Sequence, residues 1–147
     1  MAHPFLVWMA AVTRDKRTEL DYAILPKRFK QEGLLAHVHC HGKVRHALQC
    51  MLDMGVASTD PVEPPPAGDV TMAEARQIVG DRLTLLGNFE FDELEFASTD
   101  HVRRRVEEML AQGPRRLVLG ASAGPSSKIT PKLAENYKAW IDTAVKG

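Results

Sequence analysis

Helix-like and strand-like segments alternate along this chain in one repeated unit: an amphipathic stretch, a glycine, and a short apolar run. A glycine after an amphipathic stretch is typical of the left-handed residue that ends a helix, and a short apolar run after it is typical of a buried strand. Such strands need right-handed crossovers and form a parallel sheet, either open or curled into a barrel. The glycines are Gly33, Gly55, Gly80 and Gly113, and the apolar runs are residues 34–39, 56–59, 83–87 and 117–120.

The amphipathic stretches carry the usual signals of helices. Apolar residues recur at i, i+4, i+7 and i+8 in residues 44–52 and again in residues 102–110, which places them on one helix face. Thr71 and Glu74 have the spacing of a capping box at the start of a helix that ends near Gly80. A last helix is predicted from Thr130 as N-cap, Pro131 at the first helical position, and an apolar face reaching Ala144.

The segment before Gly33 is less regular. Residues 22–32 fit a helix restarted at Pro26, and residues 14–19 read as a polar connection, so residues 1–21 form a poorly defined lead-in. The apolar run at residues 4–12 is too short to span a bilayer and lacks the basic start and cleavage site of a signal peptide. We interpret it as a packed segment.

Length and charge exclude several classes of protein. With 147 residues the chain is expected to be a single domain, residues 1–147. Its 19 basic and 19 acidic residues leave no basic stripe for a phosphate backbone, so neither nucleic acid nor membrane is an expected partner. Cys40 and Cys50 form no disulfide framework, which suits a reducing cytoplasm.

Polar residues gather where the predicted strands end, which is where parallel α/β folds place their chemistry. Successive strand residues point to opposite faces, so His37, His39 and His41 are expected on one face and Cys40 among the helices. The four strand ends are residues 39–42, 60–63, 88–90 and 122–124.

Three interpretations of the histidines remain open. His39 and His41 can bind one metal ion such as zinc, with Glu63 or Asp60 completing the set. As neutral imidazoles they can instead act as acid and base. They can also simply hydrogen-bond to the backbone or to a carboxylate, with His37 as a core histidine.

The remaining strand-end residues give a candidate site with competing structural explanations. Glu63 and Asn88 are candidate catalytic residues, and Asp60, Glu90 and Ser122 are candidate substrate-binding residues. The two carboxylates before the proline run at residues 64–66 can equally face water, and asparagine is common in tight turns. With the neighbouring glycines, the serine can form an anion-binding nest or only a flexible loop.

Three stretches resemble the second half of the uroporphyrinogen decarboxylase superfamily, which includes the methylcobamide:coenzyme M methyltransferases. They are HVHCHG at residues 37–42, the segment at residues 58–88, and ITPKLAENYKAWI at residues 129–141. The resemblance implies a parallel (β/α) barrel of the TIM type, of which this chain supplies about four β/α units, a half-barrel. It also implies decarboxylation or methyl transfer on a small molecule related to tetrapyrroles or corrinoids.

The resemblance bears on the site residues as well. The methyltransferases carry a His-x-Cys-Gly zinc motif, which falls on residues 39–42 with His41 in place of the cysteine, and a late cysteine ligand would fall near Ala123. The catalytic aspartate of the decarboxylases lies in their first half, which has no counterpart here. A complete site therefore needs a homodimer or a separate first-half chain. The alternative is a non-catalytic half-barrel fragment or a self-associating interaction module.

Overall fold

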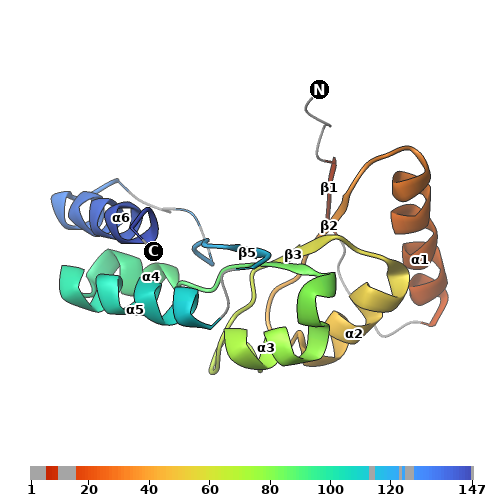
Figure 1. Cartoon of the computed structure of the whole chain (residues 1–147), viewed down its shortest axis with the longest axis horizontal. Helices are drawn as coiled ribbons and strands as arrows, with labels where there is room; N and C mark the ends of the chain where they lie inside the picture. Colours follow the sequence, from red (N-terminus) through yellow and green to blue (C-terminus); the bar gives the residue numbers. More distant parts are fainter. Residues whose placement is uncertain (1–5, 10–15, 113–114, 123, 125–127, 147) are drawn as a thin grey trace.

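The computed structural model describes residues 6–9, 16–112, 115–122, 124 and 128–146 (Figure 1). Within them the strands form one parallel five-stranded sheet, whose order follows the sequence from β1 to β5. A doubly wound sheet reverses its strand order at a switch point; the described sheet has no such reversal. The strands are β1 (Leu6–Met9), β2 (Ala36–His39), β3 (Ser58–Asp60), β4 (Thr84–Leu86) and β5 (Leu117–Val118).

The helices succeed one another around the strands, from α1 at the right of Figure 1 to α5 at the left. α1 packs against α2, α2 against α3, and α6 against both α4 and α5. The helices are α1 (Lys16–Gln31), α2 (Arg45–Met54), α3 (Met72–Val79) with the 3₁₀ turn η1 (Gly80–Arg82), α4 (Phe91–Phe96), α5 (Thr99–Ala111) and α6 (Pro131–Ala144).

Two apolar clusters hold the described chain together. The first joins the helix-facing residues of β2 and β4 to α2 and α3, and it includes Val38, Leu48 and Leu85. The second lies among α4, α5 and α6 and receives Phe89 from the segment after β4. Phe89 is fully buried, and its ring centroid lies 5.9 Å from that of Trp140. This residue therefore fixes the end of β4 against α6.

Helix ends follow the sequence signals closely. Thr71 and Glu74 form the predicted capping box, and the Thr130 side chain accepts a hydrogen bond from the Leu133 amide, as an N-cap does. Gly55 is left-handed at φ 79° and ends α2, as a glycine can at little steric cost. Gly113 lies outside the described residues.

All four predicted strands are present, although each is shorter than its apolar run. A fifth strand was not predicted: Leu6–Met9, within the poorly defined lead-in, pairs in parallel with β2. α1 is also one continuous helix through Pro26, so residues 16–19 are helical and do not form a polar connection. No helix in the described ranges is long and apolar enough to cross a membrane.

Candidate functional site

The three histidines lie at the carboxyl end of β2, as the alternation of strand residues predicts. Ala36 and Val38 are buried, while His37 and His39 face the other side of the sheet. The parallel register places His37 opposite Ser58 and His39 opposite Asp60. The sheet itself therefore brings imidazoles and a carboxylate into contact.

Asp60 joins two of the histidines. One of its oxygens, Oδ1, is 2.8 Å from Nε2 of His37 and 2.9 Å from Nδ1 of His39. Because a carboxylate oxygen only accepts, both of these ring nitrogens carry their hydrogen. In a neutral His37 ring, Nδ1 then accepts from the Ser58 hydroxyl at 2.8 Å. Ser58, His37, Asp60 and His39 thus form one continuous hydrogen-bonded chain across two strands.

Glu63 holds the third histidine. Its Oε1 is 2.9 Å from Nδ1 of His41, and its Oε2 accepts the Gly42 amide at 2.6 Å. The glutamate is 8% exposed, whereas the His41 side chain is 53% exposed. The rings of His39 and His41 lie edge to face with centroids 4.6 Å apart. A buried carboxylate therefore fixes the orientation of a solvent-facing imidazole.

The arrangement leaves the same nitrogen available on two histidines. His39 and His41 each donate from Nδ1 to a carboxylate, and no hydrogen bond among the described residues uses their Nε2 atoms. Metal-binding histidines are commonly oriented by such a carboxylate. Within the described residues, however, no group of three or more His, Cys, Asp or Glu side chains is arranged to hold a metal ion. The cluster offers two imidazole nitrogens toward a metal or a reacting atom.

Cys40 lies on the opposite side of the strand, as predicted. It packs partly buried against the first apolar cluster. Burial raises the pKa of the Cys40 thiol, and the negative charge of Glu63 raises it further. The thiol is therefore disfavoured as a thiolate, and the sheet separates it from the histidine face.

Glu90 and Ser122 meet at the ends of β4 and β5. The two segments stay paired beyond β4 and β5. Phe89 forms a parallel β-bridge with Ala121, and the Ser122 amide donates to the Phe89 carbonyl at 2.8 Å. The Ser122 hydroxyl donates to Glu90 Oε2 at 3.0 Å and accepts the Phe91 amide at 3.2 Å. Burial raises the pKa of Glu90, and the charges of Glu63, Asp92 and Glu93 add to the rise against the lowering effect of Ser122.

The other candidate residues at the strand ends make fewer contacts that would support a role in the site. Asn88 is buried at 4% exposure, and its side chain makes no hydrogen bond to the histidine cluster among the described residues. The Ser122 amide is already bonded to Phe89, so it is not free to line an anion-binding nest. Ala123, the position of the expected late ligand, lies outside the described residues.

Two residues of the site were not predicted from the sequence. Ser58 was missed because the register that brings it to His37 is not visible in the sequence. Gly68 was missed because it lies in a proline-rich loop, yet a Cβ there would come within 1.9 Å of the Glu63 carbonyl oxygen and 3.0 Å of the Gly42 carbonyl oxygen. Glycine at this position lets the loop after β3 close on the loop after β2.

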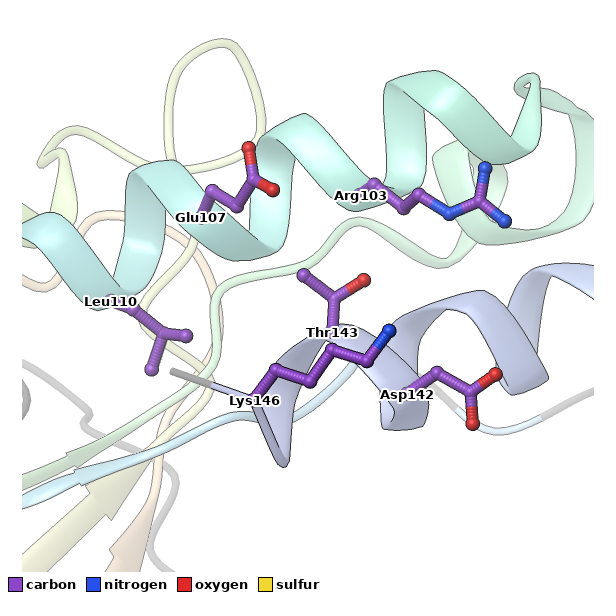
Figure 2. A pocket seen from close by; sticks show the side chains of 6 residues that line it. All are labelled: Arg103, Glu107, Leu110, Asp142, Thr143 and Lys146. Carbon is purple, nitrogen blue, oxygen red and sulfur yellow. The ribbon is translucent and has the colours of Figure 1, made fainter.

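A separate groove lies between α5 and α6 and is shown in Figure 2. Its volume is about 330 Å³, and two basic and two acidic side chains share its lining. None of its residues comes from a strand end, so it is distinct from the histidine cluster. The lining residues are Arg103, Glu107, Leu110, Asp142, Thr143 and Lys146.

Comparison with known proteins identifies the family. The family model described as uroporphyrinogen decarboxylase (URO-D) matches residues 22–146. A solved methyltransferase from Methanosarcina mazei superposes with a TM-score of 0.65 at 23% identity, covering 85% of this chain and 35% of that one. This chain therefore spans about a third of that structure. A search of curated proteins gave no match. The chain belongs to the uroporphyrinogen decarboxylase family.

Proposed function

We propose that this chain forms part of a uroporphyrinogen decarboxylase-like (β/α) barrel enzyme, whose histidine–carboxylate cluster acts on a small molecule related to tetrapyrroles or corrinoids. The reaction is decarboxylation or methyl transfer. The observation that carries the proposal is the pairing of His37 and His39 with Asp60, and of His41 with Glu63, at the carboxyl ends of two neighbouring strands. Enzymes with parallel strands place their active sites at this edge.

In a metal-free reaction the cluster supplies acid and base. The carboxylates hold both Nδ1 hydrogens, so Nε2 of His39 and Nε2 of His41 each present a lone pair toward a substrate. Imidazole exchanges protons near neutral pH, which suits both proton removal and proton return. The Ser58 hydroxyl acts through His37 by fixing its ring orientation.

In a metal-dependent reaction the same two nitrogens would be the protein's ligands to a zinc ion. Zinc takes imidazole nitrogen readily and would polarise a bound thiol or carbonyl. Both Glu63 oxygens already accept hydrogen bonds, from His41 and Gly42, so Glu63 would orient His41 while water, substrate or a partner residue fills the other positions. Glu63, which the sequence-based set of His39, His41 and Glu63 included as a metal ligand, would in this arrangement orient a ligand and not bind the metal itself.

The missing strands are proposed to come from another chain. Consecutive parallel strands in sequence order are the arrangement of a barrel, and this chain spans only 35% of the solved methyltransferase it resembles. A second copy or a first-half chain would cover the sheet face that carries the histidines. The alternative is a non-catalytic half-barrel fragment that self-associates through this face.

The test is a comparison of variants in two assays. Decarboxylation is followed as carbon dioxide loss from uroporphyrinogen, and methyl transfer as loss of the methyl group from methylcobalamin to coenzyme M, with and without added zinc. The double variant His39→Ala/His41→Ala is expected to lose activity by about 10²-fold or more. The matched control is His46→Ala, an exposed histidine on α2. If the double variant changes stability alone, the non-catalytic alternative holds.

A further inference from the structure

We infer that Glu90 donates a proton to the substrate at this strand-end site and that Ser122 is the residue that positions it. The inference rests on the proposed function, which it deepens by naming the acid of the reaction. It follows from the position of the carboxyl group at the strand ends and from the difference between its two oxygens, of which one accepts a hydrogen bond and the other does not.

One oxygen of Glu90 is fixed and the other is not. The Ser122 hydroxyl donates to Oε2 at 3.0 Å, and the same hydroxyl accepts the Phe91 amide at 3.2 Å, so its orientation is set from two sides. Oε1 is buried and has no hydrogen-bond partner among the described residues. A protonated Oε1 therefore has a hydrogen to offer and no described protein acceptor for it.

The backbone holds this pair rigidly at the catalytic edge. Phe89 donates its amide to the Gly120 carbonyl at 3.1 Å and accepts the Ser122 amide at 2.8 Å, so the residue before Glu90 is tied to Gly120 and to Ser122. The fully buried Phe89 ring anchors the segment against Trp140. Glu90 thus follows β4 as Glu63 follows β3, on the same edge of the sheet.

The surroundings favour the protonated carboxyl group. Burial raises the pKa of Glu90 first of all, and the charges of Glu63 from the loop after β3 and of Asp92 and Glu93 from α4 raise it further. The Ser122 hydroxyl acts in the opposite direction, because it donates a hydrogen bond that stabilises the carboxylate left after proton transfer.

The proton transfer breaks one bond to hydrogen and forms another. The O–H bond of Glu90 breaks and leaves its electron pair on the carboxylate, while the substrate atom uses its own electron pair to form the new bond to hydrogen. In decarboxylation that electron pair is the one left on carbon when carbon dioxide departs. The carboxylate then takes a proton from solvent water, and the Ser122 hydroxyl stabilises it until it does.

The first readout does not depend on activity. In protein labelled with ¹³C at the glutamate carboxyl carbons, the Glu90 signal is identified by its loss in Glu90→Gln, and its midpoint is followed against pH. We expect a midpoint above that of an ordinary glutamate, a further rise in Ser122→Ala, and no change in the surface control Glu107→Gln. A midpoint at or below the ordinary value, or no rise in Ser122→Ala, overturns the inference.

The second readout is the pH profile of whichever assay reports activity. Glu90→Gln keeps the size of the side chain but cannot donate a carboxyl proton, so turnover should fall by about 10²-fold. The alkaline limb should disappear in Glu90→Gln and move to higher pH in Ser122→Ala, while Glu107→Gln changes neither. Unchanged turnover in folded Glu90→Gln overturns the inference and leaves the proposed function intact. A wild-type assembly that is inactive although its partner subunit is present, and that shows a raised Glu90 midpoint, contradicts the proposed function instead.

Discussion

At the scale of single residues, the cluster depends on contacts that fix side chains before any substrate binds. Each imidazole is oriented by a carboxylate, and Glu63 is itself held by the Gly42 amide at 2.6 Å. Preorganised groups of this kind lower the cost of reaching a reactive geometry. Small changes that move Glu63 should therefore affect the whole site.

Gly68→Ala is expected to disturb the site through the backbone. A Cβ at this position would lie 1.9 Å from the Glu63 carbonyl oxygen, so the loop must move. Forcing extra volume into a packed position costs about 1–3 kcal/mol of unfolding free energy. Urea unfolding monitored by circular dichroism measures the loss. Gly124→Ala is the control, since nothing lies within 4 Å of its Cβ position; equal stability of the two variants would contradict the contact.

Cys40 is expected to react slowly with iodoacetamide. Burial raises the pKa of its thiol, with the charge of Glu63 adding to the rise, and only the thiolate is reactive. In a Cys50→Ser background, the midpoint of the rate against pH should lie above that of an ordinary cysteine. Replacing Glu63 by glutamine should lower this midpoint. A midpoint at or below the ordinary value would show that Cys40 lies in a different environment.

At the scale of secondary structure elements, short-range sequence patterns predicted the strands and helix starts that depend on neighbouring residues alone. The glycines and apolar runs located β2 to β5, and Thr71 and Thr130 located two helix starts. Leu6–Met9 was missed because the repeated pattern of an amphipathic stretch and a glycine does not lead into it, and its strand is defined only by pairing with β2. α4 was missed because Phe91–Phe96 is too short to show helical periodicity.

The features of the site also divide into those that the sequence predicts and those that depend on how the strands pair. Strand alternation predicted that His37, His39 and His41 share a face and that Cys40 does not. It could not predict that one Asp60 oxygen would accept from two histidines, because that depends on the register between β2 and β3. The link between Glu90 and Ser122 likewise depends on pairing that continues past β4 and β5.

The start of α3 is expected to weaken in acid. Hydrogen bonds from the Thr71 amide, then from Arg45 and the Thr71 hydroxyl, lower the pKa of Glu74 to about 2. A lowered folded-state pKa means that the stabilisation is fully present above the ordinary value of 4.5 and is lost as pH falls toward about 2. The difference in Tm between the wild type and Glu74→Gln should shrink over this range. A difference that does not change with pH would contradict the capping interaction.

At the scale of the whole molecule, we propose that this sheet is one part of a barrel that another subunit completes. The described strands run parallel in sequence order, and the histidine cluster lies on the face opposite the first apolar cluster. A parallel sheet is normally covered on both faces. Covering this face would also enclose His39, His41 and Glu90 in a shared cavity.

Native mass spectrometry of the tagged chain, purified from the cells that make it, tests this claim most directly because one spectrum gives both assembly mass and bound metal. We predict a mass of at least two subunits, either two copies of this chain or this chain with a first-half partner. Bound zinc that disappears in His39→Ala/His41→Ala but persists in His46→Ala would distinguish the metal-dependent reaction from the metal-free one. A single chain at every concentration would contradict the completed barrel.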